Sequence, residues 1–210
     1  MRYPADHKAQ TRAKILKAAG RVFRRQGYQG GGVDAVMREA GLTHGGFYAH
    51  FRNKEALFGD AVLAALYAMR EQHDRWTEGQ RGADWVRAFV SGYLDRRHVE
   101  NAESGCPVPT LVSELGRAGD GPKREFEKGL DEWAGQISSH LGGTSSHAPD
   151  GAPDDRSDVD AAFGVIAASI GAVALARAVA DDALSDHILA STRTLIEQAV
   201  DAAPASDEET

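Results

Sequence analysis

Residues 41–57 read GLTHGGFYAHFRNKEAL, and this stretch decides the fold that we expect. Gly41 permits a sharp turn, because glycine adopts positive φ angles at little steric cost. Thr43 is a suitable N-cap for a short helix that follows. Phe47 and Phe51 lie four residues apart and so share one helical face, which we expect to pack inward. The outer face then carries two glycines among hydrogen-bonding side chains: Thr43, His44, Gly45, Gly46, Tyr48 and His50.

The residues before this stretch predict two more helices. Apolar side chains recur at helical spacing over 8–26, and Gly27 is expected to end that helix as a left-handed cap. A second short helix is expected over 33–40, ending at the turn. Two short helices joined by a glycine turn form the helix-turn-helix arrangement that enters the major groove of DNA. Such helices also occur in proteins that bind no DNA, so the pattern alone leaves both interpretations open.

The charge is divided unevenly along the chain. The 210 residues hold 24 Lys and Arg against 31 Asp and Glu, a net charge of -7 that by itself argues against a nucleic-acid partner. Residues 1–54, however, hold 11 Lys and Arg and only three acids, a net charge of +8, which leaves -15 for the remainder. A basic head on an acidic body indicates two parts with different roles.

Two patterns in the head carry a family resemblance. The chain reads TRxxILxAAxxxFxxxGY over 11–28 and VxxVxxxAGLTxGxFYxHFxNKEAL over 33–57. These patterns resemble the DNA-binding domain of the TetR/AcrR family of transcriptional regulators. The resemblance implies an all-α fold with an amino-terminal three-helix helix-turn-helix domain, followed by a helical domain for ligand binding and dimerisation. It also implies a homodimer that binds a palindromic operator in double-stranded DNA, and a small-molecule effector that releases it.

The resemblance assigns roles by position. The segment 43–51 resembles the recognition helix, and Lys54 matches a position that contacts phosphate. Asn53 is expected to cap the helix that Lys54 begins, whose amino end favours an anion. Residues 30–32 are all glycine where relatives often place Ser or Thr, so affinity leans on other cations such as Arg12. The DNA-binding residues expected are Thr43, His44, Gly45, Gly46, Tyr48, His50, Lys54 and Arg12.

Helical periodicity continues beyond the head. We expect a DNA-binding domain over 1–54, a helical effector-binding and dimerisation domain over 55–202, and an acidic tail over 203–210. Residues 142–157 have no apolar periodicity and are expected to form a mobile loop. About nine helices are expected, over 8–26, 33–40, 44–51, 54–73, 83–100, 107–117, 123–141, 158–180 and 184–202.

Composition argues against several classes of protein. The single cysteine excludes an internal disulfide and a cysteine-built zinc site. The longest uncharged run, 161–176, is shorter than a membrane span, and no signal peptide is recognised. The histidines form no compact ligand set, and no catalytic or cofactor-binding motif is found. We therefore expect a cytoplasmic regulator that is not an enzyme and has no metal or cofactor.

The last two expected helices carry the features of a dimer seam. Small residues recur along 158–180 at spacings of four and three, which permits close approach of another helix. The simpler alternative is the core of a monomer, whereas the family resemblance implies a four-helix interface between two copies. The expected interface residues are Gly164, Ala168, Gly171, Leu175, Ile188 and Leu195.

The middle helices are expected to surround an effector pocket. Cys106 lies at the start of an expected helix, where a thiol can become reactive. A regulator that senses oxidants or electrophiles through Cys106 is therefore one alternative, although a buried small apolar residue is the simpler interpretation. A helical enzyme that uses the same pocket is another alternative. The candidate lining residues are Tyr67, Trp85, Phe89, Tyr93, Cys106, Leu111, Trp133 and Phe163.

Overall fold

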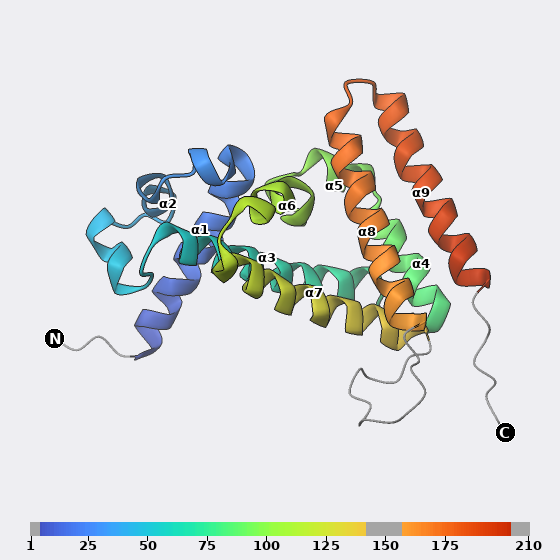
Figure 1. Ribbon diagram of the computed structural model, residues 1–210, viewed down its shortest axis with the longest axis horizontal. Helices are drawn as coiled ribbons and strands as arrows, with labels where there is room; N and C mark the ends of the chain where they lie inside the picture. The colour runs from blue at the N-terminus through green and yellow to red at the C-terminus, as the bar shows by residue number, and fades with distance from the viewer. Residues whose placement is uncertain (1–4, 142–156, 203–210) are drawn as a thin grey trace. The chain divides into compact units, whose positions relative to one another are not determined.

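The structure is a computed structural model that describes residues 5–141 and 157–202 (Figure 1). All regular secondary structure within these ranges is helical. The expected tail, and the expected mobile loop except for Ser157, lie outside the described residues. The helices are α1 (Ala5–Gly30), α2 (Val33–Glu39), the 3-10 helix η1 (His44–Ala49), α3 (Lys54–Trp76), α4 (Gly82–Tyr93), α5 (Arg96–Glu100), α6 (Val108–Arg117), α7 (Asp120–Leu141), α8 (Ser157–Ala178) and α9 (Asp182–Ala202).

The helices form two compact units. Unit 1 contains the residues up to Arg70 together with Asn101–Gly129, and unit 2 contains Glu71–Glu100 and the described residues from Leu130 onward. Both α3 and α7 therefore contribute to each unit. These units are defined by packing and do not test the domain boundary expected after residue 54, which stays a prediction. The packing groups α6 with the head rather than with the rest of the body.

Unit 1 is built around an aromatic and aliphatic core from α1, α2, η1 and α3. Phe23 of α1 meets the ring of Phe58 of α3 edge-on, with ring centroids 5.3 Å apart. Each buried side chain of this size contributes about 1.5–3 kcal/mol relative to its exposed state. Ile15, Val36, Met37, Phe47 and Leu57 are also buried in this core.

The helix α1 has a kink at Gly27, next to its contact with α6. Gly27 has φ 71° and ψ 170°, so the expected positive φ is present. The first helix ends at Gly27 as expected, and a further helical turn, which the bounds of α1 include, continues to Gly30. The backbone N–H of Tyr28, which the kink frees, donates to the Glu114 carboxylate on α6 at 2.8 Å. The amino-terminal helix is therefore held by a residue far along the chain.

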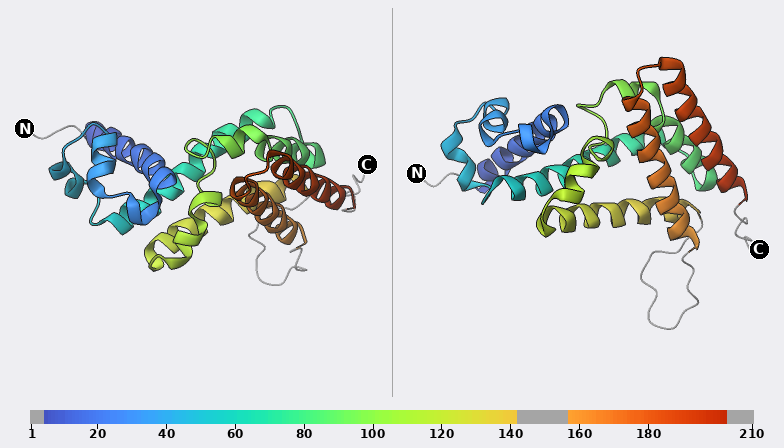
Figure 2. Two further views of the ribbon diagram at one scale, coloured as in Figure 1. Left: turned by 90° about the horizontal axis from the view of Figure 1, so that it is seen from above. Right: turned by 45° about the horizontal axis from the view of Figure 1, so that its top comes forward.

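Unit 2 contains the paired helices α8 and α9, which lie side by side in Figures 1 and 2. The helix α9 also packs on α4, and α8 packs on α5. Arg177 near the end of α8 donates to the carbonyl oxygen of His98 at 2.6 Å and to that of Val99 at 3.2 Å. These contacts attach α5 to the pair.

The helix expected over 83–100 is two helices. Leu94 ends α4 with φ -89° and ψ 33°, and Asp95 then accepts a hydrogen bond from the backbone N–H of Arg97 at 2.8 Å. An Asp side chain that accepts from a backbone N–H two residues later is an N-cap. Asp95 therefore caps a new helix, α5, although the apolar spacing of the sequence continues through this position without a break.

Gly27→Ala is expected to lower the free energy of unfolding by about 1–2 kcal/mol, because an alanine at positive φ is strained. Its Cβ would also lie 2.9 Å from Glu114 Oε1. The matched control is Gly135→Ala, where a Cβ meets nothing within 4 Å. That change should stabilise α7 by about 0.5–1 kcal/mol. Thermal unfolding measures both, and equal effects of the two substitutions would contradict this account of the kink.

His98 should make stability depend on pH. Burial lowers its pKa to about 4, with nearby Arg177 adding to the effect. The unfolded chain, with a His pKa of about 6.5, then binds more protons than the folded chain between about pH 4 and 6.5. Stability is therefore lost as pH falls through this window, by up to about 3 kcal/mol for this group.

The test of His98 is urea unfolding of the wild type and His98→Asn at about pH 7 and pH 4.5, on either side of the ordinary His pKa. The Asn side chain keeps a donor for the Tyr93 carbonyl, which lies 2.7 Å from His98 Nδ1, but it does not titrate. The variant should lose less stability than the wild type on acidification. An identical loss in both proteins would exclude the assigned role.

Candidate DNA-binding surface

The helix η1 presents a polar outer face, which we call the η1 surface and define as Thr43, His44, Gly45, Gly46 and Tyr48. Of these residues Gly46 is half-buried and the other four are exposed, and the side chain of Tyr48 reaches 68% exposure.

This orientation follows from burial of the opposite face of η1. Phe47 is fully buried, Phe51 is 4% exposed, and their rings stack with centroids 5.8 Å apart. The inward packing expected for both phenylalanines is confirmed.

The expected recognition helix is shorter and tighter than an α-helix. The backbone N–H of Gly46 donates to the carbonyl of Thr43 at 3.1 Å, and that of His50 donates to Phe47 at 2.9 Å. Thr43 occupies the N-cap position but makes no capping hydrogen bond through its side chain. Its hydroxyl is therefore not used by the helix. Gly41 has φ 65°, as the turn before this helix requires.

A short hydrogen bond that the sequence analysis missed lies at the edge of this surface. Asp34, in the first turn of α2, has Oδ1 2.5 Å from Nδ1 of His44. The ring of His44 also lies 6.0 Å from the ring of Tyr48, measured between centroids. The spacing of ten residues crosses the turn at Gly41, so only the geometry of that turn brings the pair together.

Lys54 is held at the start of α3 by contacts with the residues after the kink. Its Nζ lies 4.5 Å from the centroid of the Tyr28 ring and 3.3 Å from the carbonyl oxygen of Gln29. Partial burial lowers the pKa of Lys54, while nearby Glu114 opposes that effect. The expected cap is confirmed, because Asn53 Oδ1 accepts from the backbone N–H of Ala56 at 2.7 Å.

Arg12 and His50 are near enough for the charge of Arg12 to affect the pKa of His50. Arg12 Nη2 is 2.6 Å from Asp60, and the guanidinium lies 5.0 Å from the centroid of the Phe51 ring. His50 is half-buried rather than fully outward, and its Nδ1 has no hydrogen-bond partner among the described residues. Burial, followed by the charges of Lys8 and Arg12, lowers its pKa.

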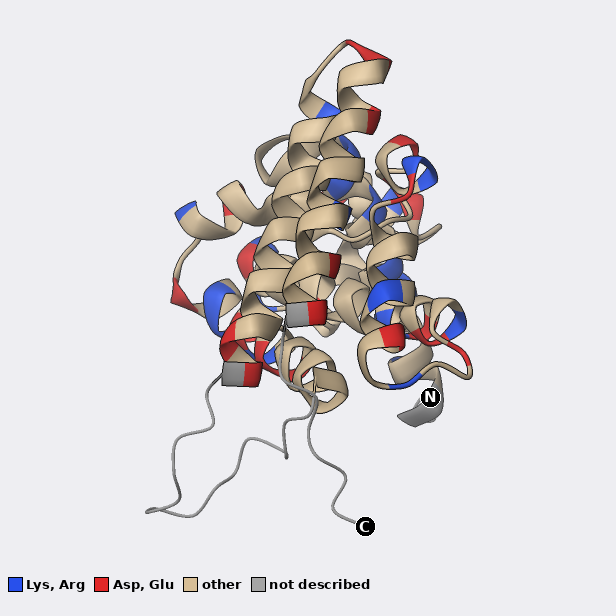
Figure 3. Cartoon of the chain, turned by 90° about the vertical axis from the view of Figure 1, so that its right-hand side faces the viewer, with Lys and Arg blue, Asp and Glu red and all other residues tan. Residues whose placement is uncertain are grey.

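Part of the positive charge of α1 is used inside unit 1. Arg21 Nε donates to Glu39 at 2.9 Å, and Arg25 lies 3.4 Å from the same carboxylate. Arg24 Nε donates to the carbonyl of Glu103 at 2.7 Å. These arginines therefore stabilise unit 1. Figure 3 marks all Lys and Arg residues of the described chain in blue.

Four of the eight candidate pocket residues form one aromatic cluster in unit 2. Trp85, Phe89, Tyr93 and Trp133 are all buried, and Phe89 lies within 6.0 Å of the Trp133 ring centroid. The ring of His73 joins this cluster, stacked on Trp133 with centroids 5.6 Å apart. The other candidates lie elsewhere: Tyr67 and Phe163 are exposed, and Cys106 and Leu111 are buried in unit 1.

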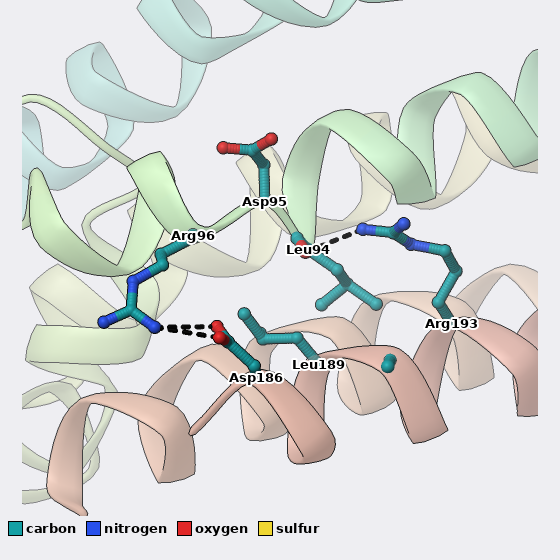
Figure 4. Close-up of a pocket in the computed structure, with 7 residues that line it drawn as sticks. Leu94, Asp95, Arg96, Asp186, Leu189 and Arg193 are labelled. Carbon is teal, nitrogen blue, oxygen red and sulfur yellow. Dashed lines mark hydrogen bonds and ion pairs between the residues drawn. The ribbon is translucent and has the colours of Figure 1, made fainter. Parts of the chain in front are cut away.

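Unit 2 also has a surface hollow of about 230 Å³ between α4, α5 and α9 (Figure 4). Arg96 Nη1 contacts Asp186 at 2.9 Å, and Arg193 Nη2 donates to the Leu94 carbonyl at 2.9 Å. The hollow is smaller than the roughly 300–1,000 Å³ of typical ligand pockets. Its lining contains none of the eight candidate pocket residues.

Cys106 and the histidines give little sign of other chemistry. Cys106 has no exposed surface, which favours its interpretation as a packed core residue over a reactive thiol. Within residues 5–141 and 157–202, no group of three His, Cys, Asp or Glu side chains could hold a metal ion.

The expected dimer residues lie on the α8–α9 pair. Leu175 is 59% exposed and Leu195 is 62% exposed, and neither contributes to the core of unit 2. Gly164 is exposed, whereas Ala168, Gly171 and Ile188 are half-buried. By length and composition alone α8 could cross a membrane, and 39% of its apolar window is buried within the chain; one such helix is weak evidence for a membrane span.

Sequence comparison connects the head to known regulators. The profile described as "Bacterial regulatory proteins, tetR family" matches residues 15–61. The chain is 29% identical to the HTH-type transcriptional regulator LmrA of Bacillus subtilis (strain 168) over 126 residues, which cover 59% of this chain and 67% of LmrA. It is 28% identical to the HTH-type transcriptional repressor NemR of Escherichia coli (strain K12), over 57% of this chain and 61% of NemR. Sequence similarity thus spans about two thirds or less of these relatives' own length.

Solved structures extend the likeness to the whole fold. A TetR transcriptional regulator from Chloroflexus aurantiacus J-10-FL matches 94% of this chain and 97% of its own with a TM-score of 0.70 and 24% identity. The reduced form of Escherichia coli NemR matches 94% of this chain and 100% of its own, with a TM-score of 0.72 and 20% identity. At these identities the likeness shows the fold. The matched profile and the curated relatives are transcriptional regulators rather than enzymes, and this chain is a helix-turn-helix transcriptional regulator of the TetR family.

Proposed function

We propose that this chain is a cytoplasmic repressor that binds a palindromic DNA operator as a homodimer and is released by a small molecule. The observation that carries the proposal is the η1 surface, whose polar groups face outward on a helix-turn-helix in a head of net charge +8. Hydrogen-bonding side chains on an exposed short helix are suited to base edges and phosphates. The name of the relative NemR, a transcriptional repressor, supports repression as the outcome.

Phosphate binding is assigned to the start of α3 and to the edges of the η1 surface. Lys54 stands at a helix amino end, where the unpaired backbone N–H groups favour an anion. Its contact with the Tyr28 ring holds the ammonium at a fixed place, so less conformational entropy is lost on binding. Tyr48, Arg12 and His50 are proposed to add contacts with the DNA backbone.

The α8–α9 pair is the proposed dimer interface. Leu175, Leu184 and Leu195 are exposed on these helices, and burying them against a second copy would remove apolar area from water. A two-fold dimer places two recognition elements about one DNA turn apart, which matches a palindromic site.

The effector is proposed to act by population shift. Release from DNA requires that the effector bind the conformation that does not fit the operator more tightly than the one that does. The buried aromatic cluster of unit 2 would favour an apolar or aromatic molecule.

A gel-shift or anisotropy titration with the DNA upstream of the gene that encodes this chain tests DNA binding. Lys54→Ala should weaken binding to all sequences and reduce the slope of log K against log salt by about one, because one phosphate contact is lost. Lys128→Ala, which removes an equal charge from a Lys paired with Glu125 on α7, is the matched control and should change neither. Absence of specific, salt-sensitive binding by the wild type would refute the proposal.

Leu195→Glu should separate the proposed dimer, because it places a charge in an apolar interface. Sedimentation should then show monomers, and operator affinity should fall at least tenfold because the two half-sites are no longer bound together. Val112→Glu, at another exposed apolar position on α6, should leave the dimer intact. A Leu195→Glu protein that remains a dimer would contradict this choice of interface.

A further inference from the structure

A carboxylate lies beside the outward face of η1, where a DNA-binding surface would not be expected to carry one. Asp34 has a 72% exposed side chain, and the only contact described for its carboxylate here is with His44, at 2.5 Å. An acid in this place repels phosphate and so costs affinity. By contrast, Glu39, another acid of the head, is occupied by Arg21 and Arg25 inside unit 1.

We propose that Asp34 sets the operator preference by fixing which nitrogen of His44 reads the DNA. The inference rests on the proposed function, because it assigns base reading to the η1 surface. Asp34 acts here as a positioning residue, since its effect on DNA passes through the ring of His44.

The assignment follows from the chemistry of the two groups. An ionised carboxylate only accepts hydrogen bonds, so the short contact requires a proton on His44 Nδ1. When the ring carries one proton, that proton is therefore on Nδ1, and Nε2 is left with a lone pair. The Nε2 atom is then a hydrogen-bond acceptor. Without Asp34 the ring can place its single proton on either nitrogen, and Nε2 can also become a donor.

The tautomer determines which base is recognised. In the major groove, adenine and cytosine present amino-group donors, whereas guanine presents only acceptors. An acceptor at His44 Nε2 therefore favours adenine N6 or cytosine N4 and disfavours guanine. A donor at the same atom would favour guanine O6 or N7. The ligand class assigned to His44 is consequently a base that presents an exocyclic amine in the major groove, adenine or cytosine.

Few other groups on the η1 surface compete with this reading. Gly45 and Gly46 carry no side chain, so they offer no side-chain donor or acceptor. His44 is half exposed, with a 50% exposed side chain, and the nearby Tyr48 ring limits its orientation on one side. Specificity at one base pair in each half-site should therefore depend strongly on this one ring.

Two simpler roles for Asp34 make different predictions. Asp34 lies in the first turn of α2, where an acid stabilises the helix. It could also act only by repelling phosphate. Removing the acid would in the first case lower stability, and in the second raise affinity for every sequence alike. Neither role changes the ratio of affinities between two operators.

The test is selection of DNA from a pool randomised over the half-site, followed by sequencing, with the full-length dimer at about pH 8.5, where a histidine ring carries a single proton. The wild type should prefer adenine or cytosine at one position by about tenfold, the size of one hydrogen bond. Asp34→Ala should reduce this preference to within about twofold. Glu39→Gln removes an acid from the same head and should leave the preference unchanged.

A double-mutant comparison shows whether Asp34 acts through His44. His44→Ala should lose the preference at the same position, and adding Asp34→Ala to it should change nothing further. An effect of Asp34→Ala on preference that persists without His44 would overturn the inference, as would a preference that survives in Asp34→Ala. A wild type that selects no sequence refutes the proposed function instead, so the two failures are distinguishable. Because preference is a ratio, partial unfolding of a variant does not affect it.

Discussion

Phe47 and Phe51 stack on one another inside unit 1, and the η1 surface depends on their burial. The helix η1 has six residues, too few to hold its shape in water by backbone hydrogen bonds alone. The two buried aromatic rings fix the orientation of η1, so its polar residues face away from the core of unit 1. Phe51 also supports the Arg12 guanidinium, which lies over its ring. A substitution that loosens this packing would therefore disturb base reading and phosphate contacts together.

The head is also tied to a helix much later in the chain. The Glu114 carboxylate accepts the backbone N–H of Tyr28, and the Tyr28 ring in turn lies under Lys54. Just after the carboxyl end of α6, Glu55 of α3 accepts the backbone N–H of Gly119 at 2.9 Å. Polar contacts of this kind have short range and fixed geometry. A displacement of α6 would thus reach the residues proposed to bind phosphate.

The sequence predicts the helices well where one signal dominates. Apolar periodicity places α1, α3 and α9, and the turn at Gly41 follows from its residue type. Periodicity alone joins α4 to α5, because Asp95 as an N-cap competes with a pattern that continues past it. It also does not distinguish a 3-10 helix from one short α-helix at η1. The pairs Asp34–His44 and Tyr28–Glu114 require tertiary geometry, since no periodicity relates residues separated by a turn or by several helices. The candidate pocket could be predicted only as a set of large side chains, and packing brings four of them together.

The central claim is that a dimer of this chain reads a palindrome through two η1 surfaces. Hydroxyl-radical footprinting on the DNA upstream of the gene that encodes this chain tests the claim most directly. The account predicts two protected segments related by two-fold symmetry, with centres about one helical turn apart, near 34–36 Å. A single protected segment, or uniform protection that disappears with moderate salt, would contradict it.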